Sequence, residues 1–278
     1  MTLVFLNGQI IKEEEAKISI SDLSYQFGYG LFETLRCENG TPVFFEDHYR
    51  RLTHSARELD MPFPVEQNEV KNWMKEVIKA NKLTKARIKI IISRKLEDKF
   101  NVLIIASPLD NLPVSYSLLG WTLGRDINSV SFRHKTTSRA DSYVAYKKAL
   151  EEGCNDALYL NEKNELIECT RANIFLVTGD KIITSLLESG ILSGVTRAKI
   201  LEIARQRNFE IEEKIVHSLY LNKTDEVFIT NAIIGVMPIS KIKLPDKELS
   251  FNSRYITDQI KKAYELLVND YVSVCKTI

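Results

Sequence analysis

The sequence predicts an α+β fold in two domains, and three observations support this. First, 44% of the 278 residues are hydrophobic and 27% are charged, enough to bury a core in each of two compact domains. Second, strand-like runs follow one another closely, with helical patterns grouped between them. Third, residues 107–117, SPLDNLPVSYS, concentrate Pro, Asp, Asn and Ser, which favours a linker. We expect an N-terminal domain at 1–108, a linker at 109–119 and a C-terminal domain at 120–278.

The N-terminal half is expected to combine strands with two helices. Asn7-Gly8 and Asn39-Gly40 are typical of tight hairpin turns, and each lies between two strand-like runs. The expected strands are Leu3–Leu6, Gln9–Lys12, Leu31–Cys37, Pro42–Phe45, Ile88–Ser93 and Val102–Ala106. The expected helices are Glu46–Leu59 and Gln67–Ala80, because each places apolar residues three or four apart on one stripe.

The C-terminal half is richer in strands. An amphipathic helix at Ser142–Glu152 is followed by Gly153, a residue type that commonly ends helices. Further helices are expected at Thr196–Gln206 and from Ser253 to about Leu267. The expected strands are Ala157–Leu160, Glu165–Glu168, Ile174–Val177, Ile182–Thr184, Ile211–Val216 and Val227–Thr230. Because most connections between these strands are short, we expect an antiparallel core.

Composition and charge exclude several classes of protein. Thirty-eight basic and thirty-seven acidic residues give a net charge of +1, which recruits neither nucleic acid nor an anionic membrane. The four cysteines are scattered without a CxxC pair, so we expect free thiols, no metal site and a reducing cytoplasm. No apolar stretch approaches the ~20 residues of a membrane span, and the N-terminus reads as a strand entering a hairpin rather than a signal peptide. A small-molecule partner is the default expectation.

The segment from Glu168 to Arg197 carries the clearest candidate site. The chain has no GxxxxGK[ST], HExxH or GxSxG motif, and Gly28-Tyr29-Gly30 lacks the third glycine of a dinucleotide-binding loop. By contrast, Gly194-Val195-Thr196-Arg197 opens an expected helix, whose first N–H groups have no partner within the helix and can bind a phosphate.

Four blocks in this segment resemble the class IV aminotransferase family, the fold-type IV pyridoxal-phosphate enzymes. The blocks are Glu168, Asn173-Ile174-Phe175, Ile182-Ile183-Thr184 and Leu192-Ser193-Gly194-Val195-Thr196-Arg197, at the intervals of the family signature. Similar flanking motifs are Tyr25–Thr34, with Tyr29 in place of the usual Asp, together with His48–Leu52, His134-Lys135 and Asn231-Ala232-Ile233. The resemblance spans nearly the whole chain. It implies a smaller N-terminal α/β sandwich and a larger, barrel-like β-rich C-terminal domain with helices.

The resemblance implies that pyridoxal 5'-phosphate is the cofactor, with Lys135 as its Schiff-base lysine. Such a lysine must be neutral part of the time, which requires partial burial and nearby positive charge. Glu168 would pair with the pyridine nitrogen and keep the ring able to accept electrons. On spacing alone Lys135 reads as a solvated charge, and only the resemblance singles it out. Without the downstream blocks, Glu168 would read equally well as an outward-facing strand residue.

Phosphate binding is implied for a second set of residues. Arg51 would form paired hydrogen bonds to the phosphate, with Arg50 beside it on the helix surface. Val195 and Thr196 would donate from a helix start, and the loop at Asn231 and Ala232 would add a second phosphate contact. From the residues alone, Arg51 is also a surface charge, Thr196 a plain helix-start residue and Asn231 a turn residue.

Within the family, three features favour an aminodeoxychorismate lyase over an amino-acid transaminase. Thr34, after Phe32-Glu33, resembles lyases in placing a hydroxyl that can relay a proton. Val236-Met237-Pro238 follows Asn231-Ala232 as in lyases, and Ala140 stands where branched-chain transaminases usually have a tyrosine. A branched-chain or D-amino-acid transaminase remains the alternative, and an inactive relative that binds the cofactor is a third.

Recognition of the substrate carboxylate and assembly stay open at this stage. The segment Lys95–Lys99 joins its flanking strands in few residues, whereas many relatives have a longer glycine-rich loop with a carboxylate-binding arginine. Candidate substitutes, each also readable as a surface charge, are Arg94, Arg125, Arg139 and Arg171. The resemblance also implies a homodimer acting on a small-molecule amino substrate.

Overall fold

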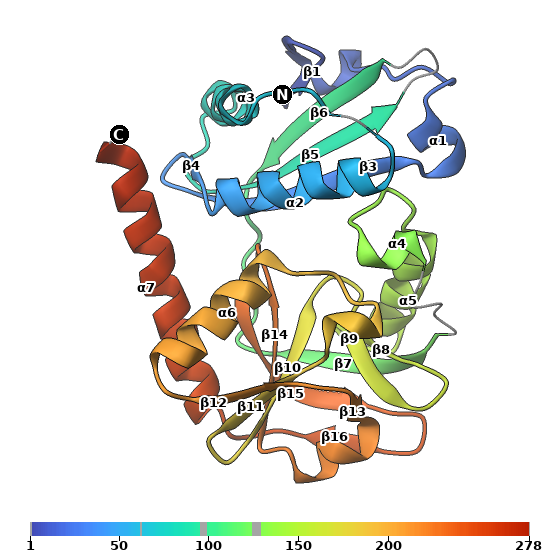
Figure 1. Ribbon diagram of the computed structural model, residues 1–278, viewed down its shortest axis with the longest axis vertical. Helices are drawn as coiled ribbons and strands as arrows, with labels where there is room; N and C mark the ends of the chain where they lie inside the picture. The colour runs from blue at the N-terminus through green and yellow to red at the C-terminus, as the bar shows by residue number, and fades with distance from the viewer. Residues whose placement is uncertain (1, 62, 95–98, 124–128, 278) are drawn as a thin grey trace. The chain divides into compact units, whose positions relative to one another are not determined.

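The structure is a computed structural model that describes residues 2–61, 63–94, 99–123 and 129–277 (Figure 1). The chain divides into two compact units. Unit 1 consists of 1–111, 134–139 and 268–278, and unit 2 of 112–133 and 140–267. Both units combine helices with strands, so the α+β prediction is confirmed. The boundaries at 108 and 119 remain a prediction, and one strand already begins at Tyr116.

Unit 1 is built on an antiparallel sheet with the strand order β2-β1-β6-β5-β3-β4. Its strands are β1 (Leu3–Leu6), β2 (Gln9–Lys12), β3 (Gly30–Glu38), β4 (Thr41–Pro42), β5 (Ala86–Arg94) and β6 (Phe100–Ser107). Both predicted hairpin turns are present. Asn7 and Asn39 have φ of 50°, and the glycines that follow have φ of 95° and 77°, as a turn with two positive φ angles requires.

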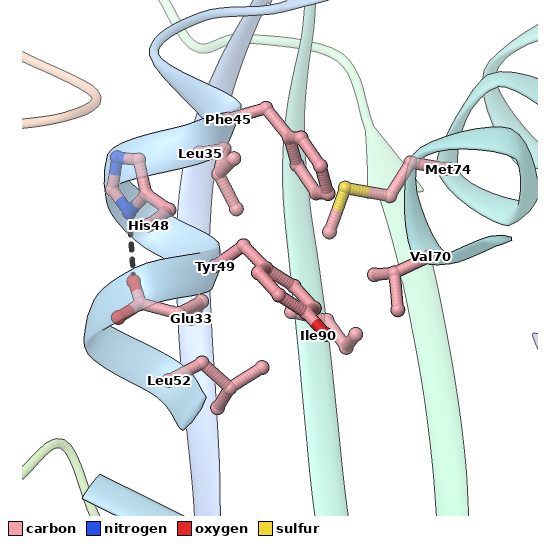
Figure 2. Close-up of a pocket in the computed structure, with 9 residues that line it drawn as sticks. All are labelled: Glu33, Leu35, Phe45, His48, Tyr49, Leu52, Val70, Met74 and Ile90. Carbon is pink, nitrogen blue, oxygen red and sulfur yellow. Dashed lines mark hydrogen bonds and ion pairs between the residues drawn. The ribbon is translucent and has the colours of Figure 1, made fainter. Parts of the chain in front are cut away.

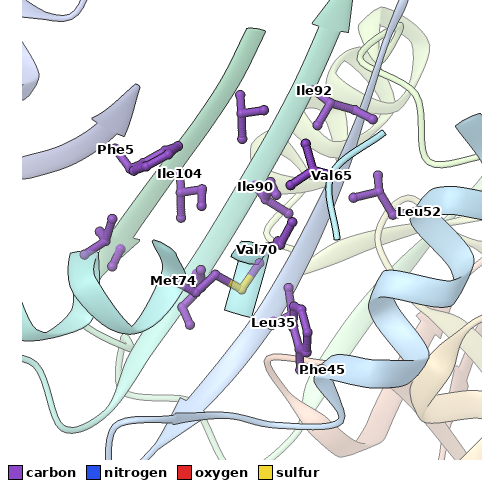
Figure 3. Close-up of a cluster of buried hydrophobic side chains, with 14 of the residues drawn as sticks. Phe5, Leu35, Phe45, Leu52, Val65, Val70, Met74, Ile90, Ile92 and Ile104 are labelled. Atoms are coloured by element: carbon purple, nitrogen blue, oxygen red, sulfur yellow. The ribbon is translucent and has the colours of Figure 1, made fainter. Parts of the chain in front are cut away.

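Helices α2 (Phe45–Glu58) and α3 (Gln67–Ala80) supply apolar side chains to the core of unit 1. Figure 2 shows Phe45 and Tyr49 of α2 pointing toward Val70 and Met74 of α3. Figure 3 shows the same core continuing over the strands to Ile90, Ile92 and Ile104. Shorter helices are the 3₁₀ turn η1 (Glu13–Glu15) and α1 (Leu23–Phe27).

The prediction of a strand at Pro42–Phe45 is wrong beyond Pro42. Phe44 has φ of 51°, a left-handed conformation that ends the extended backbone, and α2 begins at Phe45. The buried rings of Phe44 and Phe45 are apolar enough to read as a strand in the sequence, although here they belong to a helix start.

Unit 2 contains a larger sheet with the order β12-β11-β10-β14-β15-β7-β8-β9-β13, and β16 pairs with β15. Its strands are β7 (Tyr116–Thr122), β8 (Asp156–Leu160), β9 (Glu165–Cys169), β10 (Asn173–Thr178), β11 (Lys181–Thr184), β12 (Glu210–Glu213), β13 (Val216–His217), β14 (Glu226–Asn231), β15 (Gly235–Lys243) and β16 (Glu248–Ser250). The predicted antiparallel core is correct for most neighbours. However, β7 pairs in parallel with both β8 and β15, and β11 with β12, because longer connections that contain helices separate them in the chain.

The helices of unit 2 are α4 (Val130–Arg133), α5 (Ala140–Glu151) and α6 (Val195–Gln206), with 3₁₀ turns η2 (Leu187–Ser189) and η3 (Ser218–Lys223). The last helix, α7 (Tyr255–Thr277), runs ten residues beyond the predicted end at Leu267, and its final part belongs to unit 1. The predicted strand Ile211–Val216 is divided into β12 and β13, which pair with different strands. None of the described helices is both long and apolar enough to cross a membrane.

Candidate active site

Lys135 is held at the edge of the unit 1 sheet by backbone hydrogen bonds. The Phe32 N–H donates to the Lys135 carbonyl at 2.9 Å, and the Thr137 N–H donates to the Gly30 carbonyl at 2.8 Å. A bridge between Leu31 and Thr136 completes this short pairing beside β3. Just before His134-Lys135, Val130–Arg133 forms the short helix α4. The backbone around Lys135 is thus fixed independently of its side chain.

The glycine-containing motif before β3 shapes this attachment. The Thr137 hydroxyl donates to the Gly28 carbonyl at 2.8 Å and accepts from the Ser24 hydroxyl at 2.9 Å. A Cβ atom on Gly30 would lie 2.9 Å from the Thr137 Oγ1 atom, and Gly28 has φ of 67°. Both positions therefore require glycine. Tyr29, where the family usually has Asp, donates its hydroxyl to the Leu59 carbonyl.

Three cationic side chains gather at the ring of Phe32, which projects from β3. The charged atoms of Lys135, Lys89 and Arg139 lie 4.6, 4.8 and 6.0 Å from the ring centroid. We call these three residues the cation cluster. Burial, together with the charge of Arg139, lowers the pKa of Lys89. Like charges this close repel one another, and an anion bound among them would relieve the repulsion.

Thr34 lies on the same face of β3 as Phe32, because alternate residues of a strand share a face. Its cross-strand partner in the register of β3 and β5 is Lys89. The structure therefore brings the predicted residues Thr34 and Lys135 to the same region of unit 1. Lys89 was not among the predicted residues, since only the pairing register reveals it.

Arg51 faces inward from α2, whereas Arg50 is 74% exposed and pairs with Asp47. The Arg51 Nε and Nη2 atoms each donate to a different oxygen of Glu33, both at 2.7 Å. The Glu33 carboxylate also accepts from His48 Nδ1 at 2.8 Å, a contact drawn in Figure 2. The interpretation of Arg51 as a solvated surface charge is therefore excluded, while its contact to a phosphate stays a prediction.

The Glu33–His48 pair is buried, with 1% and 2% of the two residues exposed. Burial opposes ionisation of Glu33, but Arg51 and His48 outweigh it and hold the pKa of Glu33 well below its usual range. Burial also lowers the pKa of His48. We therefore describe His48 as neutral, with its Nδ1–H donated to Glu33. The adjoining cavity of about 10 Å³ holds about one water at most, so it is no substrate site.

In unit 2, Glu168 is buried at the end of β9, and 7% of it is exposed. Its Oε2 atom accepts hydrogen bonds from the Asn173 side-chain amide and from the Leu192 N–H, each at 3.2 Å. The Asn173 amide also donates to the Leu192 carbonyl at 3.0 Å. The interpretation of Glu168 as an outward-facing strand residue is thus excluded. Asn173 was identified only as part of a motif, without a role.

The start of α6 lacks a side-chain cap. Its N-cap is Gly194, which provides no side chain to satisfy the first N–H groups of the helix. Val195 and Thr196 follow in the first turn, and both are buried. A Cβ atom on Gly194 would lie 2.1 Å from the Asn173 Oδ1 atom, so only glycine fits here. Thr196 is not an N-cap, because Gly194 occupies that position.

Asn231 closes the turn after β14. Its Oδ1 atom accepts from the Ile233 and Ile234 N–H groups, both at 2.9 Å, and its amide donates to the Arg171 carbonyl at 3.1 Å. The side chain thus makes the contacts of a turn residue, and a phosphate contact from this loop falls to backbone groups such as the Ala232 N–H. Thr230, which precedes Asn231, pairs with Asn173 in the register of β10 and β14.

Comparisons with known proteins identify the family. Residues 30–242 match the model of the amino-transferase class IV family. The chain belongs to the class IV aminotransferase family. A putative branched-chain-amino-acid aminotransferase of Methanocaldococcus jannaschii is 27% identical over 86% of this chain and 87% of its own. The aminodeoxychorismate lyase of Bacillus subtilis is 26% identical over 87% of each chain.

Solved structures confirm the fold type. The crystal structure of a putative 4-amino-4-deoxychorismate lyase from Legionella pneumophila has a TM-score of 0.84 and 26% identity, and the match covers 93% of this chain and 97% of that one. Class IV aminotransferases have the two-domain α+β fold of type IV, which is the fold of this chain. Enzymes of the family depend on pyridoxal 5'-phosphate.

The residues of this family member fit that cofactor. In the described part of unit 2, the Thr230 hydroxyl is buried without a partner beside the strand that carries Asn173, and α6 starts at an uncapped glycine. These donors suit a phosphate, and the buried Glu168 carboxylate suits a protonated ring nitrogen. In unit 1, the Thr136 hydroxyl next to Lys135 is likewise buried without a partner among the described residues.

Two of the four candidate carboxylate-binding arginines are engaged in other contacts. Arg94 donates to the Asp60 carbonyl at 2.9 Å. Arg171 lies 3.8 Å from the Tyr146 ring centroid and 3.6 Å from the Asp156 carboxylate. Arg125 and most of the Lys95–Lys99 segment lie outside the described residues. Arg139 is the candidate that the structure places in the same cluster as Lys135.

Proposed function

We propose that this protein is a pyridoxal-phosphate-dependent 4-amino-4-deoxychorismate lyase, which produces 4-aminobenzoate and pyruvate for folate biosynthesis. The observation that carries the proposal is the position of Thr34, on the Phe32 face of β3 and opposite Lys89. A hydroxyl at this place can deliver a proton to the leaving group, which a lyase requires and a transaminase does not. The similarity to the lyases of Bacillus subtilis and Legionella pneumophila supports this choice.

Each proposed site residue has a distinct task. When bound, pyridoxal 5'-phosphate supplies the electron sink for the substrate carbon that carries the amine. Lys135 bonds covalently to it and moves a proton at its Nζ atom, while Glu168 pairs with the ring nitrogen. Arg51, the first-turn N–H groups of Val195 and Thr196, and the loop at Asn231 and Ala232 bind the phosphate. These assignments carry the family roles onto the matching residues of this chain.

The reaction balances without a second substrate. Lys135 takes the proton from the amine-bearing carbon, the bond from the ring to the enolpyruvyl oxygen breaks, and the ring becomes aromatic. The hydroxyl of Thr34 relays a proton to the methylene carbon of the leaving group, which departs as pyruvate. Arg139 and Lys89 of the cation cluster bind a substrate carboxylate, because their charged groups lie at the same Phe32 side chain as Lys135.

A product assay tests the proposal. Purified protein loaded with cofactor is incubated with 4-amino-4-deoxychorismate and no keto acid, and 4-aminobenzoate and pyruvate are measured. We expect equal amounts of both products. Thr34→Val removes the hydroxyl at nearly constant volume and should lower turnover by ~10²-fold or more, whereas Thr34→Ser retains it and should stay within ~10-fold of wild type. If the wild-type protein forms no 4-aminobenzoate in this assay, the proposed lyase activity is wrong.

An amino-acid transaminase is the second candidate, favoured by the similarity to the putative branched-chain-amino-acid aminotransferase of Methanocaldococcus jannaschii. The cation cluster would then bind the second carboxylate of an acceptor such as 2-oxoglutarate. Transamination requires an added keto acid, so product formation that depends on 2-oxoglutarate would identify this activity. An inactive relative would bind the cofactor and yield product in neither assay. A homodimer in the cytoplasm remains our expectation for either enzyme.

A further inference from the structure

Glu33 lies on β3 directly before Thr34, the residue proposed to relay a proton. Successive side chains of a β-strand point to opposite faces, so Glu33 projects from the face of β3 opposite to that of Phe32 and Thr34. Only 1% of Glu33 is exposed, and both carboxylate oxygens are engaged by side chains of α2. This carboxylate therefore does not contact a substrate on the Phe32 face. Any contribution it makes to the site must pass through His48 or Arg51.

We infer that Glu33 is a positioning residue, which holds the guanidinium of Arg51 in the one orientation that binds the cofactor phosphate. The inference rests on the proposed role of Arg51. Paired hydrogen bonds from Nε and Nη2 fix the plane of the guanidinium as well as its place.

His48 holds the carboxylate of Glu33 from a second direction. His48 and Arg51 lie one turn apart on α2, three residues from each other, so they project from one side of the helix. Glu33 accepts from both and thereby joins α2 to β3 at a single buried point. A histidine and an arginine on one rigid helix leave the carboxylate little freedom, and its position in turn limits that of Arg51.

Charge alone predicts the opposite effect of Glu33 on phosphate binding. A carboxylate 2.7 Å from Arg51 offsets its positive charge and weakens attraction for any other anion. If Glu33 acted only through its charge, removing that charge would strengthen phosphate binding. If it acts by orienting Arg51, removal weakens binding. The sign of the change therefore distinguishes the two roles.

The test compares pyridoxal 5'-phosphate with pyridoxal, which lacks the phosphate. Dissociation constants of both are measured by absorbance for the cofactor-free wild-type protein and for Glu33→Gln. We expect the affinity for pyridoxal 5'-phosphate to fall about 10- to 100-fold, by analogy with the loss when groups that orient metal-binding residues are removed. Affinity for pyridoxal should change less than about twofold. Unchanged or tighter phosphate binding, or an equal loss for both ligands, overturns the inference.

A matched control lies on the same strand. Glu38 is also buried on β3 and pairs with Arg36 at 2.6 Å, so Glu38→Gln removes an equivalent buried charge without touching Arg51. This variant should retain the wild-type ratio of the two affinities. Should Glu33→Gln fail to fold, Glu33→Asp keeps the charge but draws the oxygens back from the guanidinium. Loss of preference for the phosphate form supports positioning, and a wild-type preference overturns it.

Variants of Arg51 separate this inference from the proposed function. If Arg51→Ala leaves the affinity for pyridoxal 5'-phosphate unchanged, the proposed phosphate contact is wrong and the inference falls with it. If Arg51→Ala weakens phosphate binding but Glu33→Gln does not, only the inference is overturned. In an Arg51→Lys background, where the paired hydrogen bonds are absent, Glu33→Gln should add less than about a twofold further loss.

Discussion

The side-chain amide of Asn173 donates a hydrogen bond to the Glu168 carboxylate at 3.2 Å. The same amide donates to the Leu192 carbonyl at 3.0 Å, two residues before the glycine that precedes α6. Asn173 thus joins the carboxylate proposed for the ring nitrogen to the helix start proposed for the phosphate. A single side chain on β10 therefore sets the spacing between the group proposed to bind the ring nitrogen of the cofactor and the group proposed to bind its phosphate.

Gly194→Ala should disturb this arrangement through a steric clash. The added Cβ would lie 2.1 Å from the Asn173 Oδ1 atom, while the backbone φ of −70° accepts alanine without strain. We expect a loss of ~1–3 kcal/mol in the free energy of unfolding and weaker cofactor binding. Chemical denaturation and absorbance titration measure these two effects. Adding Asn173→Ala should relieve the clash. Asn173→Ala should therefore lower the free energy of unfolding less in the Gly194→Ala background than in the wild-type protein.

Lys135→Ala should abolish covalent cofactor binding while preserving the fold. The hydrogen bonds to Gly30 and Phe32 come from the backbone of residues 135–137 and not from the lysine side chain. We expect borohydride treatment to attach no cofactor to the variant, turnover to fall at least ~10³-fold, and the unfolding midpoint to change little. Lys147→Ala, on the exposed face of α5, is the control and should be labelled like wild type. Cofactor trapped at another lysine of Lys135→Ala would contradict the assignment.

Tyr271→Phe should remove the hydroxyl contact between α7 and the start of α2. The Tyr271 hydroxyl accepts from the Phe45 N–H at 3.2 Å and donates to the Glu46 carboxylate. Its removal leaves a helix-start N–H unsatisfied, which should lower the free energy of unfolding by ~1–3 kcal/mol in urea denaturation. Tyr255→Phe, at a residue 73% exposed on the same helix, should change it by less than ~0.5 kcal/mol. Equal effects of the two variants would show that the hydroxyl contact contributes nothing.

Local patterns in the sequence were sufficient to predict most elements of the fold. Helix α3 coincides with the predicted Gln67–Ala80, because its apolar stripe and both ends are encoded locally. The elements missed depend on distant partners. The parallel pairing of β7 with β8 and β15 and the extension of α7 beyond Leu267 are set by tertiary contacts that periodicity does not reveal.

The candidate site shows the same division. Motifs were sufficient to select Lys135, Arg51 and Glu168 as candidates, because the family signature is local in sequence. Their partners could not be found in this way, since Glu33 and Lys89 read only as alternating strand residues. The pairing of Glu33 with Arg51 and of Lys89 with Thr34 depends on which helix and strand lie beside β3.

The Glu33–His48 pair should make the stability of the protein depend on pH. Burial holds the pKa of His48 below its ordinary value of 6.5, so the folded state resists protonation there and stability falls as the pH drops below 6.5. The pKa of Glu33 is held well below 4.5, so its contribution is complete above pH 4.5 and is lost as the pH falls further toward its folded pKa. Both groups therefore make the folded protein less stable as the pH falls.

We expect His48→Gln to be less stable than wild type at pH 7 by ~1–3 kcal/mol, a difference that narrows toward pH 5 in urea denaturation. His54→Gln, at an exposed position of the same helix, should follow the wild-type curve, and a wild-type slope in His48→Gln would show that His48 does not cause the loss.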